Sequence, residues 1–491
     1  MSILNIARNN FFTLYTVGVL VCMVIFSTLL LYGFPDSAAP WFDEGLNAGI
    51  AKSFVEHGVY SLQIGPDAFV QEKSQLITTN YPLIGFVAAS FAFFGVGLWQ
   101  AKIVMVIFLL VFVALSYFFV KKRHGNLFAL ASIALLVTFL PLYGNGKSVL
   151  GEIPGLVYLI GGLLVYQSAI SRRLFVAGIL FGLAVATKPL FLLLLPALAA
   201  GEWLEYCRMP IEKKSVVFFL RSRITLFLGI MLPLLIWSLT LVAEGQNMFE
   251  LKQAFKHYSN PYDTNLIASI VQNIKAFVTQ STPIHFLSLF LIFISAKIIS
   301  WRTIGREDVV FGVFIILNTL FFLKTAGWYR YFFPAHILLL LLFPAALSEM
   351  VSYFTELLRN TNFDDISAIS KKIVVGIVGM LFVVQMAHVF FSYDGIVYRN
   401  AIPREFAEEV NATVPNDAPV FVENHPEISF MLSGKTIYQH IRINPYLTVG
   451  ENFFTEILPP MYIISDIKTP VHWEGYDEVL KKGHYVLYKI H

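Results

Sequence analysis

The sequence contains repeated apolar runs that are long enough to cross a lipid bilayer as helices. Eleven such runs lie near residues 11–33, 101–120, 127–143, 152–169, 174–187, 189–204, 224–243, 284–300, 308–324, 331–347 and 373–392. A helix of about 20 apolar residues spans the hydrocarbon core, and inside lipid its backbone groups are satisfied within the segment. Charged residues make up only 14% of the chain, against about 25% in a soluble domain. The sequence therefore predicts an all-α polytopic membrane bundle of about 11 transmembrane helices.

Basic residues are distributed unevenly between the loops, and this sets the predicted orientation. One alternating set of loops holds sixteen Lys and Arg residues, whereas the short loops of the other set hold four. Because short cytoplasmic loops carry the excess of Lys and Arg, we expect the first set in the cytoplasm. This orientation requires that the apolar stretch 82–98 does not cross. Pro82 opens that stretch, and Gly95 and Gly97 close it, so we expect an outer juxtamembrane or membrane-inserted helix.

Residues 1–392 are expected to form one transmembrane catalytic domain, and its two long loops, 34–100 and 245–283, are expected on the outer side. Both contain apolar stripes at helical spacing, which is typical of helices lying on the membrane interface. The stripe in 44–57 consists of Leu46, Ile50 and Phe54. Those in 245–283 consist of Met248, Leu251, Phe255 and Tyr258, and of Ile267, Ile270, Ile274 and Phe277.

The C-terminal region, 393–491, has a mixed polar composition that differs from the rest of the chain. A helix-like segment, "PREFAEEV", precedes four strand-like segments, "APVFVE", "KTIYQH", "MYIISDI" and "HYVLYKI". Short runs rich in β-branched and aromatic residues between turn residues indicate strands. We therefore expect a small extracytoplasmic α/β domain.

Three acidic residues at the outer ends of predicted helices are candidates for catalysis. Asp43 and Glu44 lie in "PWFDEGLNAG" beyond the first apolar run, and Glu152 opens a later one in "GNGKSVLGEIPG". A carboxylate there can deprotonate an acceptor hydroxyl or amine, and an ionisable group at membrane depth is often functional. Asp43 equally suits the N-cap of helix 44–57, and Glu152 suits a helix N-terminus by its charge. Lys147 is interpreted as a solvated loop charge.

Basic and aromatic residues at the same membrane face are candidates for binding an anion. Arg330 and Lys324 lie in "LKTAGWYRYFFPAH" beside Tyr329, and Lys188 lies between two short helices in "VATKPLF". Arg offers a planar fork of donors to phosphate oxygens, and Lys offers a point charge. The alternatives are an aromatic belt at the interface and a lysine that extends to it. His336, inside the next run, is interpreted as a packed core residue.

The sequence contains no nucleotide-binding or metal-binding pattern. No Gly-rich phosphate loop followed by Lys and Ser or Thr occurs, and no dinucleotide fingerprint occurs. The two cysteines, Cys22 and Cys207, offer neither a disulfide framework nor a zinc pattern. We therefore expect no metal and no cofactor.

These motifs, in this order along the chain, resemble those of the GT-C membrane glycosyltransferases. The shared features are the acidic pair after the first helix, the Pro-started helix, "GE", "TKP" and "RYFFP". The resemblance is greatest to the protein O-mannosyltransferase and aminoarabinose lipid A transferase group and covers about residues 1–350. Related enzymes often have a Lys or a Pro pair where this chain has Asn80 and Tyr81 before a single Pro82.

The resemblance implies an inverting glycosyltransferase that uses a polyprenyl-phosphate sugar donor. Asp43 would be the base, supported by Glu44 and by Glu152 as a second acidic position. Arg330 and Lys188 would hold the donor phosphate, with Tyr329, Lys324 and Tyr81 as further substrate-binding candidates. The sugar, hexosyl or pentosyl, would pass to a glycan, lipid or protein at the extracytoplasmic face of, most simply, a bacterial inner membrane. The alternatives are a membrane transporter, against which the absence of an internal repeat speaks, and a lipid-glycan ligase.

Overall fold

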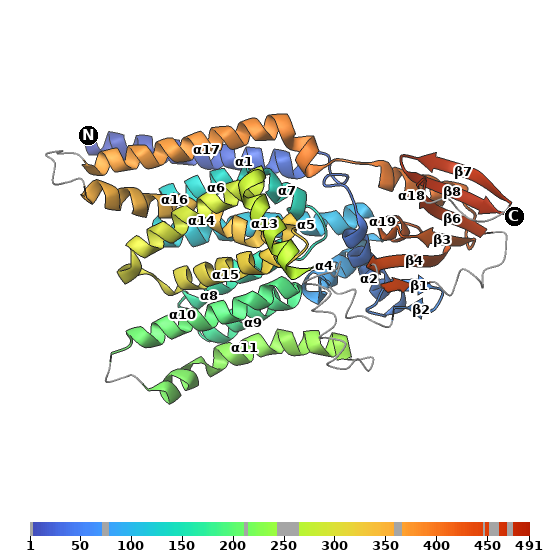
Figure 1. Ribbon diagram of the computed structural model, residues 1–491, viewed down its shortest axis with the longest axis horizontal. Coiled ribbons are helices and arrows are strands. Elements are labelled where there is room, and N and C mark those ends of the chain that lie inside the picture. The colour runs from blue at the N-terminus through green and yellow to red at the C-terminus, as the bar shows by residue number, and fades with distance from the viewer. Residues whose placement is uncertain are drawn as a thin grey trace.

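The computed structural model describes residues 3–70, 78–210, 215–242, 265–357, 366–444, 447–450, 461–468 and 475–491. Long helices run side by side along one axis, and a small sheet stands at one end of the bundle (Figure 1). The N-terminus lies at the opposite end of the molecule from that sheet. The architecture is therefore a helical bundle with a C-terminal α/β unit, as the sequence predicts.

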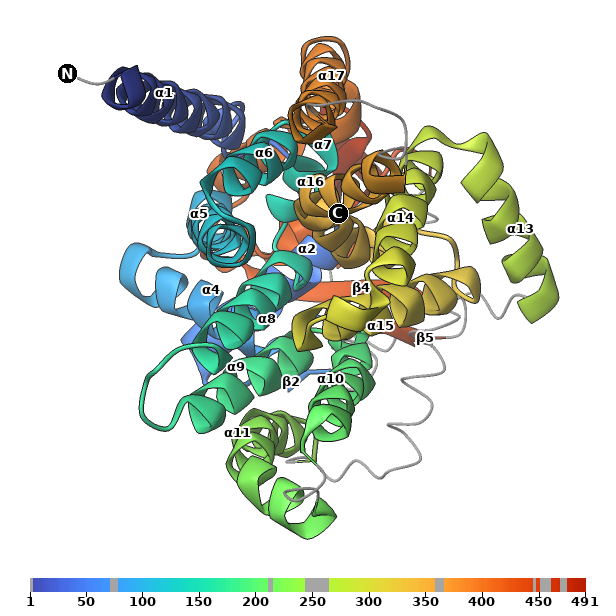
Figure 2. The same ribbon diagram turned by 90° about the vertical axis from the view of Figure 1, so that its left-hand side faces the viewer.

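A helix or a pair of helices occupies each of the eleven predicted runs. They are α1 (Ile3–Leu31), α5 (Leu98–His124), α6 (Asn126–Val137) with α7 (Leu140–Gly146), α8 (Glu152–Tyr166), α9 (Arg173–Thr187), η1 (Pro189–Leu193) with α10 (Leu194–Arg208), α11 (Val216–Val242), α14 (Ser281–Ile299), α15 (Arg306–Leu323), α16 (Phe333–Leu357) and α17 (Ile366–Val397). In the end-on view, α16 lies near the middle of the bundle and α11 at its edge (Figure 2).

Six helices among the described residues are long and apolar enough to cross a membrane. The number becomes seven if α6 and α7, which meet at an angle of 64°, form one broken span. The chain is therefore an integral, multi-pass membrane protein. The predicted number of about 11 spans is not confirmed, because helices such as α8 and α9 have only 15 residues each. An α-helix of that length covers roughly 22 Å, less than the hydrocarbon core of about 30 Å.

The stretch 82–98 forms helix α4 (Tyr81–Phe94), which is 14 residues long. Pro82 stands in its first turn, and Gly95, with a φ of 82°, ends it. A glycine adopts this left-handed conformation without steric cost. At 1.5 Å per residue the helix extends roughly 21 Å, so its length fits the predicted helix that does not cross.

Small residues bring α9 and α11 into close contact. A Cβ atom on Gly178 would lie 2.3 Å from the carbonyl oxygen of Leu226, and one on Gly229 would lie 2.3 Å from that of Phe175. Gly178 and Gly182 are four residues apart and face α11 together, the spacing that lets membrane helices approach closely. Direct backbone packing, rather than interdigitating side chains, therefore joins α11 to the bundle.

Helix α2 (Phe42–His57) lies between the bundle and the C-terminal unit (Figure 1). It packs against α4 on one side and against α19 (Pro426–Ser429) on the other. The ten consecutive residues Glu44–Ser53 are buried, including Leu46 and Ile50 of the predicted stripe. The expectation of a helix lying free on the membrane interface is therefore wrong for α2, because protein covers it.

Helix α13 (Leu266–Thr279) keeps the amphipathic character predicted for the second outer loop. Ile267 and Ile274 are exposed, whereas Phe277 is buried. On the inner side, the Asn273 amide donates to the carbonyls of Phe322, Leu323 and Thr325 at 3.0–3.1 Å, at the C-terminal end of α15. The predicted stripe from Met248 to Tyr258 lies outside the described residues.

The C-terminal unit is a mixed six-stranded sheet with α18 (Ile402–Thr413) on one face. Its strands are β3 (Pro419–Glu423), β4 (Thr436–Asn444), β5 (Leu447–Val449), β6 (Met461–Asp466), β7 (Tyr476–Lys482) and β8 (Tyr485–Ile490), in the order β5-β4-β3-β6-β8-β7. The strand β3 pairs in parallel with β4 and β6, and the remaining pairs are antiparallel. Alternate residues of β3 enter two cores, Val420 and Val422 beneath α18 and Phe421 on the other face.

The sequence predicts four of these strands and the helix but misses β5 and β7. The residues of β7 are "YDEVLKK", and most of them are exposed. An edge strand in water needs no apolar face, so the alternation that marks the other strands is weak there. A separate two-stranded hairpin, β1 (Gln63–Gly65) with β2 (Ala68–Phe69), follows α2. The Gln439 amide of β4 donates to the Gln63 carbonyl at 2.6 Å.

Candidate functional site

Two ion pairs lie close together where the bundle meets the C-terminal unit. Asp43, in the first turn of α2, pairs with Arg330 in the short helix η4 (Tyr329–Tyr331). Glu152, the first residue of α8, pairs with Lys188 at the junction of α9 and η1. Lys188 also interacts electrostatically with Arg330 and Asp43. We call these four residues the ion-pair cluster.

The cluster joins segments that are far apart in the sequence. Asp43 does not cap α2, since the N-cap residue is Trp41 and makes no side-chain hydrogen bond. The capping interpretation of Asp43 is therefore wrong, and its carboxylate is used to bind Arg330. Glu152 does stand in the first turn of α8, where helix-dipole stabilisation and the pair with Lys188 act together.

Aromatic rings hold the Arg330 guanidinium in place. Its central carbon lies 4.4 Å from the centroid of the Trp328 ring and 5.3 Å from that of Trp41. Burial lowers the pKa of Arg330, but Asp43, together with Tyr331 and Glu152, outweighs burial and raises that pKa above its ordinary value. The side chains of Arg330 and Asp43 keep 15% and 18% of their surface exposed. A positive fork of hydrogen-bond donors is therefore fixed at a point that remains open to a ligand.

Glu44 points away from the cluster, although it follows Asp43 in the sequence. Its carboxylate pairs with Lys102 of α5 at 2.8 Å and accepts from the Val149 N–H at 3.2 Å. Both side chains are almost completely buried, at 1% and 0% exposed. Burial raises the pKa of Glu44, whereas the Lys102 ammonium acts in the opposite direction. The structure thus gives Glu44 an anchoring position and does not bring it to the cluster.

The anchoring contacts connect α2 to the loop that carries Glu152. Glu44 accepts from the backbone N–H of Val149, and the Asn47 amide donates to the carbonyl of the same residue at 2.7 Å. Val149 lies three residues before Glu152. Asp43 and Glu152 are therefore held at a defined separation by contacts to the N–H and the carbonyl of one residue, Val149.

Lys147 is buried, contrary to the expectation of a solvated loop charge. It is 2% exposed, and its ammonium donates to the Tyr393 hydroxyl at 3.0 Å and to the Tyr32 carbonyl at 3.1 Å. Burial lowers its pKa to about 7. Sequence reasoning missed both Lys147 and Lys102. The available signal was a single lysine at the edge of an apolar segment, which is costly in lipid unless it has partners.

Three other predicted residues are not part of the cluster. Lys324 is exposed, with its ammonium 5.4 Å from the Phe321 ring. The Tyr81 hydroxyl donates to the Pro233 carbonyl of α11 at 3.2 Å. The Tyr329 hydroxyl lies 3.2 Å from Nδ1 of His336, which is buried within α16 as expected. Of these residues, Tyr329 is next to the cluster in the sequence, because it precedes Arg330.

Unused hydrogen-bonding atoms lie in the segment that approaches Lys188. The backbone N–H of Asn80 donates to the carbonyl of Thr187, the residue before Lys188, at 2.9 Å. Within the described residues, both side-chain polar atoms of Asn80, the Thr79 hydroxyl and Oε2 of Glu152 are buried without a hydrogen-bond partner. Buried polar atoms normally have partners, so these atoms are suited to a ligand at the cluster. Asn80 stands where the sequence departs from the motifs that it otherwise resembles.

No group of three or more His, Cys, Asp or Glu side chains in the part of the chain that the structure describes is arranged to hold a metal ion. The ionisable groups of the site pair with one another as acid and base partners. The chemistry that they offer is anion binding and proton transfer.

Comparisons with known proteins agree on the fold. No protein-family model and no curated protein sequence matches the chain. The solved structure of ArnT from Cupriavidus metallidurans in the apo state is similar, with a TM-score of 0.64, 13% identity and 98% of each chain covered. ArnT bound to undecaprenyl phosphate gives a TM-score of 0.65 and 13% identity, covering 96% of this chain and 97% of that one.

An oligosaccharyltransferase is also similar. The Archaeoglobus fulgidus enzyme in complex with Zn and sulfate gives a TM-score of 0.53 and 10% identity, covering 92% of this chain and 68% of that one. ArnT and the oligosaccharyltransferase are GT-C glycosyltransferases. The fold predicted from the order of short motifs is confirmed: the chain has the GT-C fold.

Proposed function

We propose that this protein is an inverting glycosyltransferase that moves a sugar from a polyprenyl-phosphate-linked donor to an acceptor at the extracytoplasmic membrane face. The observation that carries the proposal is the ion-pair cluster. It combines two carboxylates with two cations at the junction of the bundle and the C-terminal unit. The fold supports it, since a solved structure of the same fold, ArnT, holds undecaprenyl phosphate.

Arg330 and Lys188 are the proposed ligands of the donor phosphate. Each is a cation that already forms an ion pair with a carboxylate, and the two interact electrostatically with each other. A phosphate can replace the carboxylates as their counter-ion, with the guanidinium fork of Arg330 binding two oxygens. The unpaired atoms of Asn80 and Thr79 beside Thr187 are available to further polar groups of the donor.

Asp43 is the proposed general base. When the donor phosphate occupies Arg330, the Asp43 carboxylate is free to accept a proton from the acceptor. The acceptor oxygen or nitrogen then forms a bond to the anomeric carbon, and the bond from that carbon to the phosphate oxygen breaks. The electron pair leaves with the polyprenyl phosphate, whose added charge Arg330 and Lys188 stabilise. One displacement inverts the anomeric centre.

The charges at the opposite end of the bundle support an extracytoplasmic site. Arg123 at the end of α5 pairs with Asp308 at 2.9 Å, and Lys297 at the end of α14 pairs with Glu349 at 2.9 Å. These residues belong to or adjoin the predicted cytoplasmic loops. We call Arg123, Lys297 and their two acidic partners the basic network. Helix α5 begins near Lys102, which contacts α2, and ends at this basic network. The ion-pair cluster and the basic network therefore lie at opposite ends of α5.

The proposal is tested by sugar transfer in purified, reconstituted protein. We would supply a radiolabelled polyprenyl-phosphate sugar pool and an acceptor extract from native membranes, and compare wild type with Asp43→Asn. Glu56→Gln is the matched control, since Glu56 is an exposed carboxylate on the same helix. We expect Asp43→Asn to lower the transfer rate by about 100-fold or more, as is typical of removing a catalytic base, and Glu56→Gln to leave it unchanged.

Equal transfer by wild type and Asp43→Asn would refute the assignment of Asp43 and make Glu152 the leading base. Wild-type protein that is folded but transfers no sugar from this pool would refute the transferase proposal. Flux assays would then examine the transporter alternative, and assays of whole-glycan transfer would examine the lipid-glycan ligase.

A further inference from the structure

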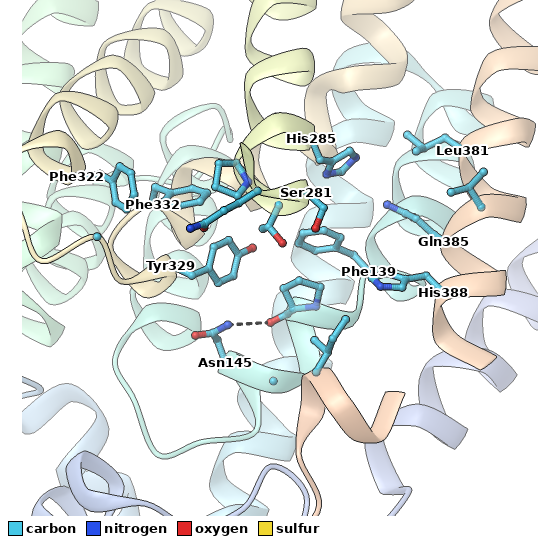
Figure 3. A pocket seen from close by; sticks show the side chains of 18 residues that line it. Phe139, Asn145, Ser281, His285, Phe322, Tyr329, Phe332, Leu381, Gln385 and His388 are labelled. Carbon is cyan, nitrogen blue, oxygen red and sulfur yellow. Dashed lines mark hydrogen bonds between the residues drawn. The ribbon is translucent and has the colours of Figure 1, made fainter. Parts of the chain in front are cut away.

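A cavity of about 660 Å³ reaches the residue that precedes Arg330 of the ion-pair cluster. It is lined by α7, the start of α14, the C-terminal half of α17 and the segment around Tyr329, the residue before Arg330 (Figure 3). Binding cavities for small ligands typically have volumes of about 300–1,000 Å³. The cavity is therefore large enough for a sugar head group.

The lining of this cavity differs from the cluster because it carries no ionic side chain. Of the 18 lining residues, all within the described part of the chain, none is Asp, Glu, Lys or Arg. Hydrogen-bonding groups come from Asn145, Ser281, His285, Gln385 and His388, which are labelled in Figure 3. An anion or cation would be desolvated there without a counter-charge, which is costly. The lining favours an uncharged, polar ligand.

A chain of hydrogen bonds in the wall suits hydroxyl groups in particular. The Tyr329 hydroxyl contacts Nδ1 of His336 at 3.2 Å, and Nε2 of His336 contacts Nδ1 of His285 at 2.9 Å. With neutral rings, hydrogens can be placed in two ways. In the first, the Tyr329 hydroxyl donates to His336, His336 donates to His285, and His285 keeps a free Nε2–H. In the second, His285 donates to His336, His336 donates to Tyr329, and Tyr329 keeps a free O–H. Each arrangement leaves one donor and one acceptor at the two ends of this hydrogen-bonded chain. A ligand hydroxyl can pair with either end, because a hydroxyl both donates and accepts.

Two buried polar atoms in the wall have no partner within the described residues. They are Nε2 of His285 and Nε2 of Gln385. Gln385 is only 7% exposed, and its Oε1 accepts from the Thr138 hydroxyl at 2.7 Å, which fixes the amide and leaves its two N–H donors unused. An unsatisfied buried donor costs free energy. A ligand hydroxyl would remove that cost.

The cavity is also open toward the membrane. Val384 of α17, which lines it, is 54% exposed, and its neighbours Val383 and Met380 are exposed apolar residues of the same helix. Phe139 and Phe332 provide flat apolar surfaces inside. Polar walls next to a lipid-facing apolar helix match a ligand with a sugar head and a hydrocarbon tail.

We propose that this cavity binds the uncharged sugar head group of a glycolipid, which is the acceptor of the transferase reaction. The inference rests on the proposed function, and it divides the substrates by charge. The donor phosphate occupies the ion-pair cluster, and the neutral acceptor approaches from the adjacent cavity. Tyr329 and Arg330 are successive residues in η4 and border one site each.

The first test measures hydrogen exchange of wild-type protein with glycolipids extracted from native membranes and separated on an anion exchanger into uncharged and anionic fractions. The uncharged fraction should protect the peptides that cover 138–146 and 281–289, and the anionic fraction should not. Protection by the anionic fraction alone, or by neither, overturns the inference. This readout needs no transfer. Protection in a protein that transfers no sugar would therefore sustain the cavity assignment while the transferase proposal failed.

The second test measures initial transfer rates with the uncharged fraction as acceptor. Gln385→Leu should raise the KM for acceptor about tenfold, the effect of losing one hydrogen bond, and leave the KM for donor unchanged. His285→Phe, which keeps a flat ring, should have the same effect on both KM values. It replaces Gln385→Leu in the test if Gln385→Leu does not fold. Gln100→Leu is the control, since the Gln100 side-chain amide donates to the nearby Phe94 carbonyl at 3.0 Å, away from the cavity. A change in donor KM alone, or no change in either constant, contradicts the proposal.

Discussion

At the scale of single residues, the site depends on charges that are buried in pairs. Lys102 and Glu44 are the most enclosed of these pairs. Removing one partner of a buried pair leaves the other charge without compensation, which costs more than the pair contributes. The pair is also the contact that fixes α2, and therefore Asp43, relative to α5. Substitution at Lys102 should thus act on stability first and on transfer second.

Lys102→Met is expected to lower the free energy of unfolding by about 3–5 kcal/mol at neutral pH. The loss should depend on pH. Without Lys102, burial alone raises the pKa of Glu44 above its ordinary value. Stability linked to a raised carboxyl pKa is present at low pH, where Glu44 is protonated in both states, and is lost as pH rises through the folded-state pKa. The deficit against wild type should therefore be smaller near pH 5 than near pH 8.

Thermal unfolding in detergent at the two pH values measures this deficit. The matched control is the double variant Glu44→Gln/Lys102→Met, which has no charge at this pair. Its deficit should be smaller than that of the single variant and nearly independent of pH. A single variant that is as stable as wild type at both pH values would show that the pair is not held as the structure has it.

The sequence predicts the members of the ion-pair cluster but not their partners. Asp43, Glu152, Lys188 and Arg330 were identifiable because each is a charge at the end of an apolar run. Which cation meets which anion depends on the tertiary arrangement of α2, α8, η1 and η4, and no local pattern encodes it. Glu44 shows how far prediction from the sequence can go, because the side chains of adjacent helix residues point about 100° apart. It therefore reaches Lys102 while Asp43 reaches Arg330.

At the scale of secondary-structure elements, the position of α2 depends on a backbone contact with the C-terminal unit. A Cβ atom on Gly45 would lie 2.2 Å from the backbone nitrogen of Glu427 and 2.4 Å from the carbonyl carbon of Pro426 in α19. The Lys52 ammonium, two turns further along α2, donates to the Leu432 carbonyl at 2.6 Å. The C-terminal unit thus packs directly against α2, the helix that carries the proposed base.

Gly45→Ala should separate α2 from α19, because backbone atoms cannot move aside as a flexible side chain can. We expect a loss of stability of about 1–3 kcal/mol, typical of overpacking, and a larger fractional loss of transfer as Asp43 moves from Arg330. Gly85→Ala in α4 is the control. Its Cβ would meet nothing within 4 Å, and alanine favours a helix by up to about 1 kcal/mol. Unfolding temperature and transfer rate measure both variants, and a fully active Gly45→Ala protein would contradict the argument.

Element prediction succeeded where an apolar period was strong and failed where burial came from other parts of the chain. The eleven apolar runs each became helical because hydrophobic length is a local property. The burial of α2 was not predicted, since α4 and α19 cover it from opposite sides. The edge strand β7 was missed for the opposite reason, because its exposed residues carry no apolar pattern.

At the scale of the whole molecule, the position of the site relative to the membrane depends on whether α4 crosses. If α4 crossed, every later loop would change sides, and the ion-pair cluster would lie where nucleotide sugars are available. Its length of 14 residues falls below the roughly 20 that a span needs. Phe86, Phe93 and Phe94 are exposed on it, as expected for a helix that touches lipid without spanning it.

Reporter fusions should therefore place the two ends of α5 and the C-terminal unit on defined sides. A reporter inserted after His124, at the end of α5, should be active as a cytoplasmic fusion. One inserted after Asn400, between α17 and α18, should be active only as an extracytoplasmic fusion. The basic network at the first position and the cluster near the second give opposite sides by the distribution of Lys and Arg. If the two reporters give the reversed sides, α4 crosses, and a donor that must be presented outside the cytoplasm would no longer be required. If both report the same side, the number of spans between α5 and α18 is even, and the predicted topology of that part is wrong.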